Sequence, residues 1–153
     1  MGVPGGPLWT CSRCGRAFPN PRQSHGCTPL SSLDGHFASS APAPEVRAAF
    51  DEILAAVRRL GPVTVLPEKS RIALQVRMSF AALMPRRRWL NGHLVLARAV
   101  DSPRFLTVQT LSARNVVHTF RLHGPEEVDA EHIGWLAEAY QVGEQRHLGR
   151  RLR

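Results

Sequence analysis

A set of sulfur and imidazole donors near the start of the chain most constrains how it can fold. Cys11, Cys14, His25 and Cys27 follow the spacing C-x2-C, ten residues, then H-x-C, and the chain has no other cysteine. Zinc takes four such donors in a tetrahedron, and two cysteines on one tight turn supply adjacent corners. Because protein atoms would fill every position, the motif predicts a structural zinc ion. A catalytic zinc ion would need an exchangeable water.

The sequence leaves two candidates for the fourth ligand. One residue separates His25 from Cys27, which is tight for two ligands of one ion, so His36 is the reserve ligand beside the three cysteines. Gly15 suits the turn that follows Cys14. Two other interpretations of the motif are unmetallated thiols on a loosely structured arm and redox use of the C-x2-C pair.

Length and composition indicate one main domain without a membrane segment. The chain has 153 residues, enough for one core and a small accessory module. No apolar run approaches the roughly 20 residues that span a bilayer, and the start lacks the regions of a secretion signal. Three cysteines in such a chain do not indicate a disulfide framework. We therefore expect a cytoplasmic protein.

The chain divides at a spacer that contains proline. Residues 1–40 are rich in Gly, Pro and Ser and cannot build a core alone, and the prolines of residues 39–44 favour an extended conformation. From Pro44 to Leu60 the apolar residues follow a 3.6 period, and Gly61 is suited to end a helix. We expect a zinc-ribbon leader over residues 1–40 and a main domain over residues 41–153.

The main domain has the pattern of an antiparallel sheet between two helices. Residues 71–80 alternate strictly between two faces, which predicts one half-buried strand. Weaker strand patterns cover residues 63–66, 90–97, 105–111 and 116–122, and a second helix is expected from Glu126 to about Leu148. The predicted fold class is α+β. A small N-terminal zinc ribbon precedes an antiparallel sheet of four or five strands, with a helix before it and a helix after it packed on one face.

Positive charge is concentrated in the middle of the chain. The formal net charge is +8, and residues 41–100 carry ten basic and four acidic side chains. Nineteen of the 20 Lys and Arg residues are arginine, which is typical of a genomic composition effect. The position of the basic residues therefore says more about a partner than the total charge does.

The candidate contacts for nucleic acid or another anion combine a loop with a sheet face. They are Arg71, Arg77, Arg86, Arg87, Arg88, Trp89 and Arg121. The three consecutive arginines precede Trp89 in an expected loop, where they could hold phosphates beside an aromatic stacking surface. The strand residues are expected, with Gln75, on the side of the sheet that faces away from the core. A solvated turn and an ordinary polar sheet surface are the alternative interpretations.

Catalytic signals are weak, so an enzyme is not the favoured interpretation. His118 and His132 fall on apolar faces of their elements and are expected in the core. No serine stands in a nucleophile motif, no glycine-rich phosphate loop is present, and the carboxylates are expected on helix surfaces or caps.

Several segments together resemble a known group of proteins. The N-terminal W-x-C-x2-C-G-R-x-F, the S-H-x-C, and Ser32-Leu33-Asp34 before His36-Phe37 resemble the zinc-ribbon leader of uncharacterised actinobacterial-type proteins. Residues 61–65, 69–73, 85–86 and 124–129 resemble their main domain, a bacterial family of unknown function often labelled "predicted transport protein". The resemblance implies no activity. It does imply that relatives of the main domain occur beside nuclease or restriction-type modules, which favours a nucleic-acid setting.

Three functional hypotheses follow. The first is a non-enzymatic zinc-containing protein that contacts DNA or RNA through a basic sheet face and loop. The second is a small-molecule binding domain or enzyme that uses a cleft between sheet and helices, lined by His118, His132 and Tyr140. The third is a protein-interaction adaptor whose ribbon exposes Trp9 and Phe18 to a partner. The oligomeric state is left open.

Overall fold

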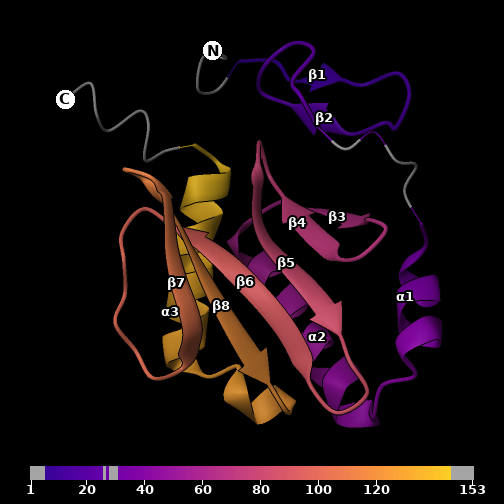
Figure 1. Cartoon of the computed structure of the whole chain (residues 1–153), viewed down its shortest axis with the longest axis vertical. Helices are drawn as coiled ribbons and strands as arrows, with labels where there is room; N and C mark the ends of the chain where they lie inside the picture. The colour runs from indigo at the N-terminus through magenta and orange to yellow at the C-terminus, as the bar shows by residue number, and fades with distance from the viewer. Residues whose placement is uncertain (1–5, 26, 28–30, 146–153) are drawn as a thin grey trace.

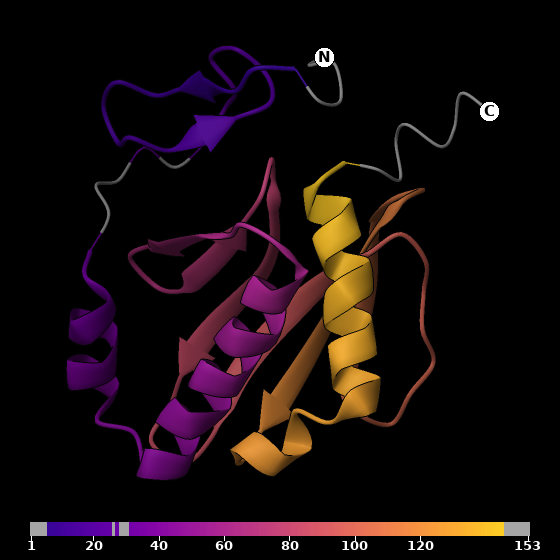
Figure 2. The same ribbon diagram turned by 180° about the vertical axis from the view of Figure 1, so that it is seen from behind.

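Two helices cover one face of a six-stranded antiparallel sheet, as Figures 1 and 2 show from opposite sides. The computed structural model describes residues 6–25, 27 and 31–145. The strands are β3 (Thr64–Pro67), β4 (Ile72–Gln75), β5 (Ser79–Pro85), β6 (Leu90–Leu96), β7 (Phe105–Ser112) and β8 (Asn115–Leu122). Their order in the sheet is β3-β4-β5-β6-β8-β7. The α+β class and the placement of both helices are as predicted, although the sheet has six strands.

The first covering helix, α2 (Pro44–Leu60), has the predicted bounds. It begins with Pro44, whose fixed φ suits a first helical turn, and it ends before Gly61 at a φ of 153°. Its apolar stripe is buried against the sheet through Val46, Ala49, Phe50, Ile53, Leu54, Ala56 and Val57. Removing this stripe from water is the main stabilising contribution of the helix.

The second covering helix, α3 (Ala130–Gly143), begins later than expected. The acidic pair Glu126-Glu127 belongs to a short 3-10 helix, η1 (Pro125–Glu127), which ends before α3 begins. Asp129 is the N-cap, and its carboxylate accepts a hydrogen bond from the His132 backbone N–H at 3.0 Å. The predicted end of this helix near Leu148 lies outside the described residues.

The prediction of one continuous strand over residues 71–80 is wrong. The chain turns back between Gln75 and Ser79, and β4 and β5 pair with each other as antiparallel neighbours. The backbone N–H groups of Arg77 and Met78 both donate to the carbonyl oxygen of Gly143, at 2.9 and 3.1 Å. The acceptor for this turn comes from α3, so the alternation of side chains along residues 71–80 does not reveal the turn.

A separate N-terminal module lies at one end of the sheet (Figure 1). It contains a small hairpin of β1 (Trp9–Thr10) and β2 (Ala17–Phe18), followed along the chain by helix α1 (Leu33–Ser40). Ser32 caps α1 by accepting a hydrogen bond from the Gly35 N–H at 2.9 Å. This helix was not predicted. The domain boundary between residues 40 and 41 stays a prediction.

The core lies between the sheet and the two helices α2 and α3. Its fully buried side chains include Phe50, Phe80, Ile53, Leu94 and Leu136. His118 and His132 are also buried, 0% and 1% exposed, as their positions on apolar faces predicted. None of the helices in the described part of the chain is long and apolar enough to span a membrane.

Candidate functional site

The four donors of the first predicted metal set lie together in the N-terminal module. We call residues 6–25 and 27 of this module, which carry the four donors and precede α1, the metal module. The ligand atoms of Cys11, Cys14, His25 and Cys27 are all within 4.8 Å of one another. The Sγ atoms of Cys11 and Cys27 are 3.7 Å apart, and Cys14 Sγ is 3.4 Å from His25 Nε2. A tetrahedral ion with bonds of about 2.3 Å to sulfur and 2.0 Å to nitrogen requires separations of about 3.8 and 3.5 Å. These residues could therefore bind one metal ion.

The turn between the first two cysteines prepares their sulfur atoms for a metal. Gly15 adopts a φ of 78° and donates its N–H to the Cys11 carbonyl at 2.8 Å, which closes the turn. Backbone N–H groups of Cys14 and Arg13 hydrogen-bond to the Cys11 sulfur and lower its pKa to about 6. Because the thiolate is the form that binds a metal, this lowered pKa favours binding at neutral pH.

The ring of His25 is held in the tautomer that a metal requires. Its Nδ1 donates to the Gln23 carbonyl oxygen at 2.6 Å, so Nε2 keeps its lone pair and faces Cys14. Phe18 packs on the imidazole with ring centroids 4.4 Å apart. His36, the reserve ligand, lies instead in α1, where its Nε2 contacts the Glu68 carbonyl oxygen.

The metal module is attached to the sheet by polar contacts. Arg16, which is 5% exposed, forms an ion pair of 3.0 Å with Glu68. Gln75 donates to the carbonyl oxygen of Ala17, and Arg77 donates to that of Gly6. Side chains of the β3–β5 region therefore position the module at this end of the sheet.

We expect Glu68→Gln to lower the free energy of unfolding by about 1–3 kcal/mol. The carboxylate of Glu68 pairs with Arg16 and, at 2.8 Å, with Arg71. The neutral amide would take the negative charge of Glu68 away from the guanidinium of Arg16, which is nearly buried. Urea unfolding followed by circular dichroism measures the change. Glu52→Gln removes an equal charge from the exposed face of α2 and is the control. Equal effects of the two substitutions would contradict this role of Glu68.

The structure gathers only some of the predicted basic residues. Arg86, Arg87 and Arg88 are exposed on the β5–β6 turn, at the opposite end of the sheet from the metal module (Figure 1). The guanidinium carbon of Arg121 lies 4.2 Å from the centre of the Trp89 ring, and its Nε donates to Asn91 Oδ1 at 3.1 Å. We name these four arginines with Trp89 the arginine cluster. Since Arg121 lies over Trp89, that ring is less open for stacking than expected.

The expected basic sheet face forms only in part. Gln75 is 5% exposed because it contacts the metal module, Arg77 donates to Gly6 and to Gln145, and Arg71 pairs with Glu68. Part of the uncovered sheet face forms a hollow of about 520 Å³. Arg71 lines it together with apolar and neutral side chains, among them Met78, Val95, Leu111, Val117 and Gln109. His93 also lines it, and burial, with the charge of Arg71, lowers the pKa of this imidazole to about 4.

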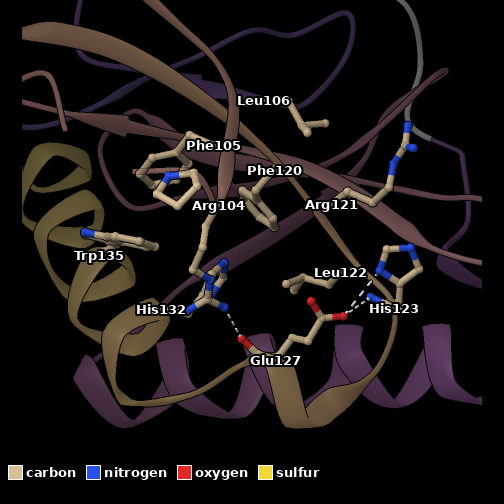
Figure 3. A pocket seen from close by; sticks show the side chains of 11 residues that line it. Arg104, Phe105, Leu106, Phe120, Arg121, Leu122, His123, Glu127, His132 and Trp135 are labelled. Atoms are coloured by element: carbon tan, nitrogen blue, oxygen red, sulfur yellow. Dashed lines mark hydrogen bonds and ion pairs between the residues drawn. The ribbon is translucent and has the colours of Figure 1, made fainter. Parts of the chain in front are cut away.

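A second cavity, of about 250 Å³, lies between the start of β7, the end of β8, η1 and α3 (Figure 3). Its lining includes Arg104, Phe120, Glu127, His132 and Trp135. Both ring nitrogens of the buried His132 lack a hydrogen-bond partner among the described residues. Burial, with the nearby charge of Arg104, lowers the pKa of this imidazole to about 4.

The cleft expected to be lined by His118, His132 and Tyr140 is not present in that form. His118 accepts a hydrogen bond from the Val100 N–H at 3.0 Å, and the Tyr140 hydroxyl donates to the Pro62 carbonyl at 2.8 Å. Of the three side chains, His132 alone lines the second cavity. The cavity was not predicted because its walls come from segments far apart in the sequence.

We expect His132 to make the protein less stable in mild acid. The unfolded imidazole titrates near pH 6.5 and the folded one near pH 4, so the unfolded chain binds the extra proton between these values. The stability that comes from keeping this imidazole neutral is therefore complete above about pH 6.5 and is lost as the pH falls below that value. From pH 7 to pH 5 the wild type should lose about 2 kcal/mol more unfolding free energy than His132→Gln. Urea unfolding of both proteins at the two pH values measures this, and parallel losses would contradict the assignment.

Comparison with known proteins identifies the main part of the chain. Residues 34–143 match the model of a family described as "Domain of unknown function (DUF5655)". The match begins after the metal motif, so it confirms neither the ribbon leader nor the transport label of the resemblance. No curated protein and no solved structure matches the chain. Because the family model covers well over half of its residues, the chain belongs to the DUF5655 family.

Proposed function

We propose that this chain is a non-enzymatic binding protein, with a structural zinc ion in its N-terminal module and a nucleic-acid contact at the arginine cluster. The observation that carries the proposal is the position of the cluster. The cluster lies at the end of the sheet opposite the metal module. Metal and nucleic acid therefore have separate roles, the first in folding and the second in binding.

The donor set favours zinc over other metals. Three cysteine sulfurs and one imidazole nitrogen form a closed tetrahedral site of the kind that structural zinc occupies. Hard cations such as magnesium and calcium prefer oxygen ligands, which this set lacks. The ion would fix the turn of Cys11–Gly15 and the segment around Cys27 against each other, a task that the two short strands β1 and β2 cannot perform alone.

The arginine cluster is suited to phosphate oxygens. Within the part of the chain that the structure describes, no acidic side chain pairs with Arg86, Arg87 or Arg88. Exposed guanidinium groups form bidentate hydrogen bonds with phosphates, and they attract phosphates most strongly where no acidic side chain is nearby. The Arg121 guanidinium, whose carbon lies 4.2 Å from the centre of the Trp89 ring, is a planar group on which a base can stack.

Titration of zinc-loaded protein with labelled single- and double-stranded DNA and RNA tests the proposal. Fluorescence anisotropy at 50 and 200 mM salt should show saturable binding. If all four arginines contact phosphates of a single strand, affinity should fall roughly 50-fold between the two salt concentrations, with proportionally less for fewer contacts. The absence of saturable binding at 50 mM salt, in protein with one zinc ion per chain, would overturn the proposal.

A further inference from the structure

The second cavity is continuous with the arginine cluster. Arg121, which belongs to the cluster, and His123 both line the cavity. Both side chains also contact Trp89 of the cluster. Trp89 has the Arg121 guanidinium 4.2 Å from its ring centre and the His123 ring 6.4 Å away, centre to centre. A strand whose phosphates rest on the cluster would therefore pass the mouth of the cavity.

The cavity contains polar atoms that have no partner within the described residues. His132 is 1% exposed, and neither of its ring nitrogens forms a hydrogen bond. The nearest acidic groups are already engaged, since Asp129 accepts from the His132 backbone N–H and from Arg104 at 2.8 Å. A neutral imidazole offers one donor and one acceptor, and leaving either unmade in a buried place is costly. A ligand with a polar edge would satisfy at least one of them.

The remaining walls favour a flat and uncharged ligand. Phe105, Phe120 and Trp135 line the cavity with aromatic rings, as Figure 3 shows. The charge of Arg104 is already balanced by Asp129 and Glu131, and Glu127 accepts a hydrogen bond from the His123 backbone N–H at 2.6 Å. A volume of about 250 Å³ is smaller than the sites that hold drug-sized molecules, and it suits a single heterocycle.

We infer that the cavity takes one unpaired base of a bound nucleic-acid strand, which His132 contacts through its polar edge while the flanking phosphates contact the arginine cluster. This inference rests on the proposed function and narrows its substrate class to single strands. A base held in a duplex would first have to leave its stack and its pair, which costs free energy that an unpaired strand does not lose. Aromatic walls with a hydrogen-bonding group are the usual means of holding such an extruded base.

The test compares strands that carry the same phosphates with and without bases. Wild-type protein should bind a run of thymidines about 10-fold more tightly than a run of abasic sites of equal length. Leu106→Trp should reduce this ratio toward 1, because Leu106 is 58% exposed and a larger side chain there closes the cavity mouth. His132→Gln should also reduce it. Val108→Trp, on the same strand and 44% exposed but outside the cavity lining, should keep the wild-type ratio.

The outcomes separate this inference from the proposed function. Affinity for the abasic run reports phosphate contact alone and should be the same in all four proteins. If that binding is present but Leu106→Trp and His132→Gln keep the wild-type ratio, the inference is overturned and the proposed function stands. If neither strand binds, both are overturned. Binding of free thymidine or uridine without strand binding would also overturn both, and would assign the cavity to a free small ligand.

Discussion

Replacing Cys11 with serine should remove the metal ion and unfold the N-terminal module while the sheet stays folded. Cys11 is 5% exposed and its sulfur is 3.7 Å from that of Cys27, so a serine oxygen would be a poor donor at a closed sulfur-rich site. Metal binding and folding of such modules are one equilibrium, worth about 10–16 kcal/mol for structural zinc in small peptides. The sheet packs on α2 and α3 around a core of its own, so it should keep its main unfolding transition.

Metal analysis and thermal unfolding measure these effects. The wild type should contain about one zinc ion per chain and the Cys11→Ser variant roughly none. Ser12→Ala changes an exposed side chain in the same turn and should leave the metal content unchanged. A chelator should reproduce the effect of Cys11→Ser on the wild type. A variant that retains its zinc, or a wild type that purifies without any metal, would contradict the assignment.

Replacing Arg87 and Arg88 with glutamine should weaken strand binding by roughly 10-fold or more at low salt. Each phosphate contact to a single strand contributes about 0.7 to the slope of log affinity against log salt, so the slope should become shallower by about 1.4. Both side chains are exposed on the β5–β6 turn, so the folded state should be unaffected. Anisotropy titrations over a range of salt concentrations give the affinity and the slope together.

The matched control removes the same charge from another surface. Arg58 and Arg59 are exposed in the last turn of α2, on the covered side of the sheet. Their double replacement with glutamine should change the slope little, since only long-range attraction is lost. Equal losses in the two double variants would show that the net charge, rather than the arginine cluster, determines binding.

Local signals in the sequence were sufficient to predict α2 and the grouping of the metal-binding side chains. Pro44, Gly61 and a stripe with a 3.6 period lie within one continuous segment, and each acts on the backbone next to it. The same holds for the C-x2-C turn at Cys11 and Cys14. The choice between His25 and His36 needed the structure, because it depends on where α1 places His36 against Glu68.

Long-range contacts explain what the sequence did not reveal. The strand prediction over residues 71–80 failed because the acceptor for the turn is Gly143, far along the chain. The expected basic sheet face is smaller than predicted because Gln75 and Arg77 contact the N-terminal module. The second cavity was missed because its walls come from β7, β8, η1 and α3. In each case the partner is distant in sequence, and side-chain periodicity carries no information about it.

Photo-cross-linking shows directly whether a strand lies over the arginine cluster. A short single strand carrying 4-thiothymidine would be irradiated with zinc-loaded protein, and the linked residues identified by mass spectrometry. Cross-links are expected at Arg121 and His123, which line the second cavity, and at Trp89, which contacts both of them. Cross-links confined to the metal module or to α2, under conditions where the strand is bound, would contradict this position of the strand.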